Sequence, residues 1–77
     1  MKDKFKKFVE EEIYNQLCYY KTDTIRVTAT RFFLTAYEDD YEYVKRQICY
    51  FISSWEGPIY LNMLPDRHEF VVTVWEI

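Results

Sequence analysis

The most reactive side chains in this sequence are one imidazole, His68, and two thiols, Cys18 and Cys49. A cysteine nucleophile needs a positioned base, and neither thiol has one nearby in the sequence. A structural zinc site takes four nitrogen or sulfur ligands, whereas only these three candidates occur and no C-x2-C pair joins them. His68 stands in a turn-like segment beside Asp66 and Glu69, without supporting groups. We therefore expect no catalytic residue, no metal site, no cofactor and no enzymatic activity.

A second group of side chains could act by binding rather than by reacting. The segment from Tyr37 to Tyr43 places four carboxylates and three tyrosines in seven consecutive residues, namely Tyr37, Glu38, Asp39, Asp40, Tyr41, Glu42 and Tyr43. Two interpretations stay open. Acidic residues at a helix N-terminus favour the helix dipole, so the segment reads as a well-capped, solvated helix start. Alternatively, the carboxylates dock on a basic surface of another protein, where they stand in for phosphates and the tyrosines add contact area.

Basic residues are concentrated at the beginning of the chain. Lys2, Lys4, Lys6 and Lys7 give residues 1–7 a net charge of +3, whereas residues 8–77 carry −6. A phosphate backbone is repelled by such an acidic body, so direct nucleic-acid binding is disfavoured. Support for it is limited to the lysines, to Arg26 and Arg31, and to sheet aromatics that could stack on bases. The single glycine, Gly57, also excludes a glycine-rich phosphate loop.

The length and composition indicate one small domain spanning residues 1–77. Hydrophobic residues make up 49% of the chain and aromatic residues 21%, which suits a short chain that needs a dense core. The longest apolar run, residues 48–52, is far shorter than the roughly 20 residues that cross a bilayer, so no membrane association is expected. No signal peptide is recognisable, and we expect a cytoplasmic protein with two buried, reduced thiols.

Hydrophobic spacing predicts a helix over residues 3–20 and a second, strongly patterned helix that starts near Asp39. Asp39 and Glu42 form an expected capping box, and Gly57 with Pro58 is the expected stop. The apolar stripe of the second helix comprises Tyr41, Val44, Ile48, Phe51, Ile52 and Trp55.

β-Branched and aromatic residues predict strands over residues 25–37, 59–64 and 70–77. In the first of these, the apolar positions change phase near Arg31, which predicts a β-bulge there or burial of different faces at its two ends. The expected fold class is α+β: helix-strand-helix-strand-strand. The sheet is expected to have three strands, mainly antiparallel, in the order 1-3-2, with two helices on one face.

Two helices on one face leave the other face of the sheet open. Val71, Trp75, Tyr60 and Phe33 are the apolar residues expected there. An exposed apolar patch of this kind is typical of an interface. Two alternatives stay open: the first helix wraps further and covers the patch, or the strands have the opposite parity and turn these residues inward.

We expect a non-enzymatic protein-binding module, namely a small acidic inhibitor that occludes a basic, nucleic-acid-binding surface of a partner protein. Small acidic accessory proteins of phages and mobile elements often act in this way. The alternative is a structural homodimer closed through the outer sheet face. A third, weaker interpretation is a nucleic-acid-binding protein that uses its lysine-rich N-terminus.

Overall fold

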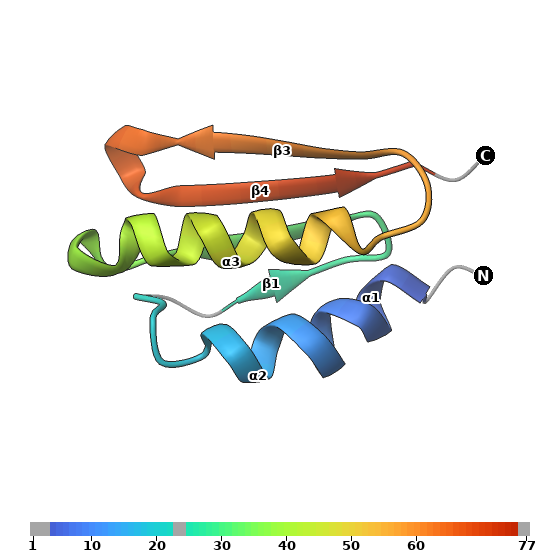
Figure 1. Ribbon diagram of the computed structural model, residues 1–77, viewed down its shortest axis with the longest axis horizontal. Coiled ribbons are helices and arrows are strands. Elements are labelled where there is room, and N and C mark those ends of the chain that lie inside the picture. Colours follow the sequence, from blue (N-terminus) through green and yellow to red (C-terminus); the bar gives the residue numbers. More distant parts are fainter. Residues whose placement is uncertain (1–3, 23–24, 76–77) are drawn as a thin grey trace.

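The computed structural model describes residues 4–22 and 25–75, which form two helices and a four-stranded antiparallel sheet (Figure 1). The first helix consists of α1 (Lys4–Phe8), the π-helical turn η1 (Val9–Ile13) and α2 (Tyr14–Leu17), and the second is α3 (Tyr41–Ser53). The strands are β1 (Arg26–Val27), β2 (Arg31–Thr35), β3 (Ile59–Leu64) and β4 (Glu69–Val74). Their order in the sheet is β1-β2-β4-β3. The α+β class is therefore confirmed.

The first helix owes its π-helical turn to the spacing of its buried residues. Phe5, Val9, Ile13 and Leu17 are all buried and follow one another at intervals of four. On an ideal α-helix, each step of four residues rotates the side chain by about 40° away from the previous one. The wider turn, closed by the Tyr14 N–H donating to the Val9 carbonyl, reduces this drift and keeps the four side chains on the sheet.

The predicted single strand over residues 25–37 is wrong in detail, because the chain reverses within it. The Thr28 N–H donates to the Arg31 carbonyl (2.8 Å), and the Arg31 N–H donates to the Thr28 hydroxyl (3.0 Å). This tight turn produces the hairpin of β1 and β2, in which Val27 lies opposite Phe32. The phase change near Arg31 thus reflects a turn and not a β-bulge. The sheet gains a fourth strand, and the three-stranded order 1-3-2 is replaced by β1-β2-β4-β3.

The three longer strands nevertheless have the expected neighbours. β3 and β4 form an antiparallel hairpin, and β4 also pairs antiparallel with β2. Between β3 and β4, the short turn η3 (Pro65–Arg67) ends at His68, which adopts a left-handed conformation (φ 53°). β4 therefore lies in the centre of the sheet, between β2 and β3. The residues predicted to end the last strand, 76–77, lie outside the described part of the chain.

The second helix has the predicted stripe but different ends. Its residues Val44, Ile48 and Phe51 are buried, and Tyr41, Ile52 and Trp55 pack against the core. The capping-box prediction is wrong. A short 3-10 turn, η2 (Glu38–Asp40), precedes α3, its N-cap residue is Asp40, and no side chain caps this end by a hydrogen bond.

The C-terminal end of α3 is set by serines and not by Gly57. The Ser53 and Ser54 hydroxyls donate to the Tyr50 and Phe51 carbonyls (2.6 and 2.8 Å), which satisfies acceptors that a helix end leaves free. Gly57 has the expected positive φ (119°), but it lies in the connector to β3.

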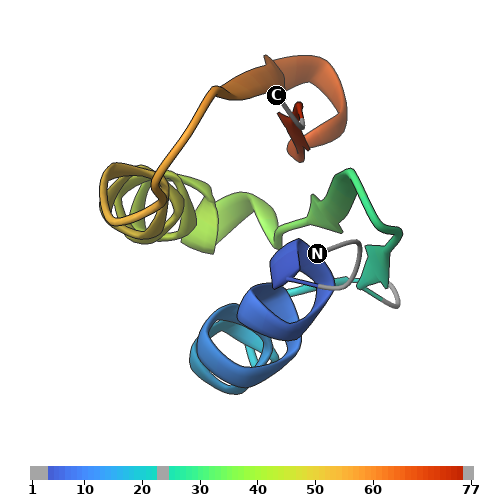
Figure 2. The same ribbon diagram turned by 90° about the vertical axis from the view of Figure 1, so that its right-hand side faces the viewer.

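Both helices lie on the same side of the curved sheet (Figure 2). Every second residue of the two central strands faces them. The core that results contains Phe32, Leu34, Ala36, Phe70, Val72 and Val74 from the sheet, together with the buried helix residues. Among the described residues, no helix is both long and apolar enough to cross a membrane.

Candidate binding surface

The outer face of the sheet consists of the residues that alternate with the core positions. Phe33 lies directly opposite Val71, and Tyr60 lies opposite Thr73. Trp75 follows Thr73 by two residues, and its N–H donates to the Pro58 carbonyl (3.4 Å). Period-two alternation therefore places the four residues predicted for this face, Val71, Trp75, Tyr60 and Phe33, on one side of the sheet.

These residues are only partly covered. Tyr60 and Trp75 remain 56% and 53% exposed, and Phe33 and Val71 are half-buried by their neighbours within the sheet. Figure 2 shows both helices on the opposite side, so that no described helix lies over this face. We refer to Arg26, Arg31, Phe33, Tyr60, Val71, Thr73 and Trp75 together as the outer patch.

Two arginines give the outer patch a positive rim. The guanidinium carbon of Arg26 lies 4.6 Å from the centre of the Phe33 ring, which is a cation–π contact across the β1–β2 hairpin. Arg31 is exposed on the neighbouring strand. The sequence could not indicate the contact of Arg26 with Phe33, because it depends on the hairpin that the strand prediction missed.

Next to Arg31 the outer patch is hollowed. The hollow has a volume of about 540 Å³, is open to solvent and is lined by Thr28, Thr30, Arg31, Phe33, Thr73, Val74 and Trp75. Its walls combine two aromatic rings, a guanidinium group and three hydroxyl groups. Such a surface accommodates a projecting apolar side chain and offers hydrogen-bond donors at its margin.

Residues 37–43, which we call the acidic segment, contribute tyrosines to the packing of the fold. Tyr41 stacks on Phe70, with ring centres 4.9 Å apart, and also contacts His68 at 5.6 Å. Tyr43 packs against Tyr20 at 4.9 Å. Of the three tyrosines, Tyr37 is the most exposed, at 49%, and no described ring packs against it.

The carboxylates of the segment are more accessible than its tyrosines. Glu38, Asp39 and Glu42 are exposed and Asp40 is half-buried, and none of them caps α3 through a side-chain hydrogen bond. Glu42 lies 4.0 Å from Lys45, an exposed pair that contributes little to stability.

The tyrosine pair also affects ionisation. The pKa of the Tyr20 hydroxyl is raised, mainly by Tyr43, because charge on one phenol opposes ionisation of the other. Burial and Asp40 raise this pKa further.

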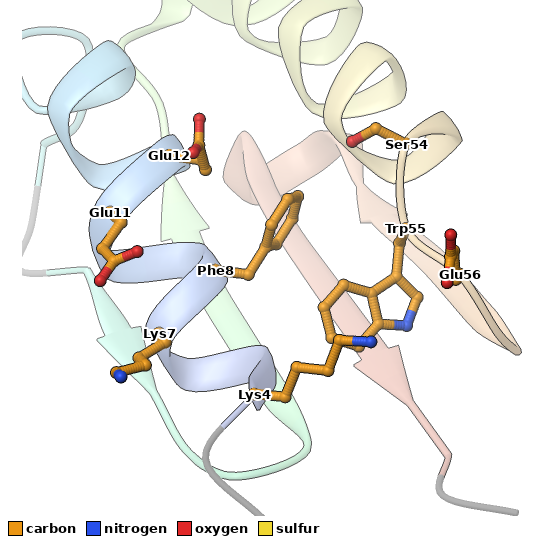
Figure 3. A pocket seen from close by; sticks show the side chains of 8 residues that line it. All are labelled: Lys4, Lys7, Phe8, Glu11, Glu12, Ser54, Trp55 and Glu56. Atoms are coloured by element: carbon orange, nitrogen blue, oxygen red, sulfur yellow. The ribbon is translucent and has the colours of Figure 1, made fainter. Parts of the chain in front are cut away.

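A second groove lies between the first helix and the end of α3 (Figure 3). It has a volume of about 450 Å³ and is lined by Lys4, Lys7, Phe8, Glu11, Glu12, Ser54, Trp55 and Glu56. The Lys4 ammonium group lies 5.4 Å from the Trp55 ring centre, and Phe8 lies 5.3 Å from it. These contacts join the two helices. They were not predicted, because residues so distant in sequence are brought together only by the fold.

The remaining candidates are dispersed. Cys18 is half-buried and Cys49 is exposed, so the prediction of two buried thiols is wrong, and the two thiols are free. Within residues 4–22 and 25–75, no cluster of three or more His, Cys, Asp or Glu residues could hold a metal ion. Lys4, Lys6 and Lys7 are exposed, and Lys2 lies outside the described residues.

No family model, curated protein or solved structure matches the chain.

Proposed function

We propose that this protein is a non-enzymatic module that binds another protein through its outer patch. One observation carries the proposal: the alternation that buries Phe32 and Val72 under the helices leaves Phe33, Tyr60 and Trp75 on a face without a described cover. Clustered exposed aromatic residues are typical of protein interfaces, where they supply much of the binding energy.

The chemistry of the outer patch defines the partner it fits. An apolar or aromatic side chain of the partner would enter the hollow beside Trp75, and carboxylates would pair with Arg26 and Arg31. A protein partner is favoured over a nucleic acid because the chain carries a net charge of −3, which disfavours a long polyanion.

The test compares three tagged proteins in pull-downs from cells of the source organism: the wild type, Phe33→Ala/Trp75→Ala and Tyr19→Ala. Tyr19 is a matched control, since it is an aromatic residue that is 84% exposed outside the outer patch. We expect the wild type and Tyr19→Ala to retain the same protein and the double variant to lose it. Retention of that protein by the double variant would contradict the proposal, provided that far-UV circular dichroism shows a folded chain.

Other occupants give different results in the same experiment. Nucleic acid in the wild-type eluate, removed by nuclease together with any captured protein, would replace the proposal with nucleic-acid binding. Capture of only the untagged copy of the chain, lost in the double variant, would favour the homodimer closed through the outer face.

The acidic segment supports a second candidate function, the predicted inhibitor of a basic surface. Glu38 and Asp39 are exposed, and no carboxylate of the segment caps α3 by a hydrogen bond, so folding leaves these groups accessible. Replacing Glu38, Asp39 and Asp40 by lysine would slow association with such a partner, and added salt would slow the wild type in the same way. Unchanged association kinetics at low salt would contradict this second function.

A further inference from the structure

The two edges of the sheet differ in how they are protected against pairing with another strand. β1 has only two residues and carries the charged Arg26. β3 has six residues, IYLNML, without a charged residue, an internal proline or a break in its register with β4. Proteins normally blunt exposed edges with charges, prolines, bulges or short strands. β3 therefore lacks the protection that β1 has.

The hydrogen bonds of β4 determine which backbone groups of β3 point outward. The Trp75 N–H donates to the Pro58 carbonyl, so Pro58 and Trp75 form a hydrogen-bonded position of this ladder. Such positions alternate in an antiparallel pair, so that Tyr60, Asn62 and Leu64 bond to β4. The N–H and C=O groups of Ile59, Leu61 and Met63 consequently point away from β4.

Within the part of the chain that the structure describes, these outward groups have no other backbone partner. Outside the strand ladders, no backbone hydrogen bond between described residues involves Ile59, Leu61 or Met63. Figure 2 shows β3 at the end of the sheet farthest from the first helix. Three donors and three acceptors, one of each from these residues, are thus directed off the edge.

We propose that β3 pairs with β3 of a second copy of this chain, antiparallel and with Leu61 opposite its own counterpart. The outward residues are symmetric about Leu61, so a two-fold axis matches every N–H with a C=O. Ile59 then pairs with Met63 of the second copy, and each of the three residues in both copies donates one hydrogen bond. Pro65 is the next residue with the outward parity and has no N–H to donate, which confines the pairing to Ile59, Leu61 and Met63.

A second copy fits this edge better than a strand of arbitrary sequence. The register brings no like charges together, because β3 carries none. Tyr60 is placed opposite Asn62 of the second copy, and the exposed Met63 is covered by Ile59. Tyr60 is the one member of the outer patch that lies on the paired strand. The other members lie on β1, β2 and β4 or follow β4, so the dimer leaves them uncovered and the proposal is independent of the proposed function.

The first test removes one outward N–H and keeps the fold. Proline is tolerated on an edge strand where its nitrogen faces away from the neighbouring strand, so Met63→Pro disrupts the dimer contact and spares the β3–β4 ladder. Met63→Ala is the matched control, since it loses the same side chain and keeps the N–H. In sedimentation equilibrium we expect dimers for the wild type and Met63→Ala, and an at least tenfold weaker dimer for Met63→Pro.

Two outcomes of that experiment would overturn the proposal. One is a wild type that stays monomeric at millimolar concentration. The other is a folded Met63→Pro variant that dimerises as strongly as Met63→Ala.

The second test checks the register in a chain without its native thiols, Cys18→Ser/Cys49→Ser. Tyr60→Cys and Asn62→Cys place thiols at a non-hydrogen-bonded pair, whose Cα atoms are about 4.5 Å apart, within disulfide reach. An oxidised mixture of the two variants should form a crosslinked heterodimer. Each variant alone should crosslink poorly, since like positions are diagonal, about 7–8 Å apart. Equal crosslinking in all three samples, or none in the mixture, would contradict the pairing.

Discussion

The two faces of the sheet are made by the same strands, yet they differ in how completely they are covered. Phe32, Leu34, Phe70 and Val72 alternate inward and are almost fully buried under the two helices. Phe33 and Val71 alternate outward and are half-buried, and Tyr60 and Trp75 are exposed. Every second residue of a central strand thus lies in the buried core, and the residues between them face solvent on the outer side of the sheet.

This difference shows how a very short chain distributes its apolar residues. Within residues 4–22 and 25–75 only two helices are available to cover the sheet, and both lie on one face. A domain of this size buries only about 60–65% of the surface of its unfolded chain, so stability depends on the inner face. The aromatic residues of the outer face add little to that core, which is why we interpret them as contact residues.

The largest expected difference in stability between the two faces is between the adjacent residues Phe32 and Phe33. Phe32→Ala should lower the free energy of unfolding by about 3–5 kcal/mol, because it leaves a cavity among fully buried side chains. Phe33→Ala should cost about 1 kcal/mol, largely through its contact with Arg26. Urea unfolding of both variants measures the difference. Equal losses would contradict the distinction between the two faces.

Substitutions in the acidic segment should have an intermediate effect on the free energy of unfolding. Replacing Glu38, Asp39 and Asp40 by lysine places positive charge at the N-terminus of α3 and should cost about 1 kcal/mol in total at low ionic strength. Thermal unfolding at low and at high salt measures this effect, which should shrink with salt because the groups lie near the surface. A salt-independent loss would mean that the segment stabilises the protein by packing rather than by charge.

The smallest effect on stability is expected at the edge of the outer patch. Trp75→Ala should change the free energy of unfolding by no more than about 0.5 kcal/mol, because the side chain is largely exposed. Tyr19→Ala, at a still more exposed position, serves as the control. A loss above about 2 kcal/mol for Trp75→Ala would show that Trp75 belongs to the core, which would contradict its place in the proposed contact surface.

Much of the fold could be predicted because its signals are local and periodic. The stripe from Val44 to Phe51 determines which face of α3 is buried, and alternation in residues 70–75 separates inward from outward residues of β4. The same alternation predicts the four outer-face residues from the sequence alone, without knowledge of their neighbours in the sheet.

The wrong predictions concern places where a side-chain hydrogen bond forms a turn or helix end that glycine or proline was expected to mark. The β1–β2 turn has no glycine, proline or asparagine, and it depends on the Thr28 hydroxyl instead. The end of α3 depends in the same way on Ser53 and Ser54. Cys49 lies beside apolar residues in sequence but on the exposed side of the helix. The contacts of Arg26 with Phe33 and of Lys4 with Trp55 are tertiary, so no local pattern indicates them.

The most direct test of the outer patch uses Trp75 as a reporter. In a Trp55→Phe variant, Trp75 is the only tryptophan, and its fluorescence quenching by acrylamide measures access to the outer face. We expect strong quenching in the isolated protein and marked protection when the captured partner is added. Protection already present in the dilute isolated protein, or quenching that the bound partner leaves unchanged, would contradict the assignment of this face as the contact surface.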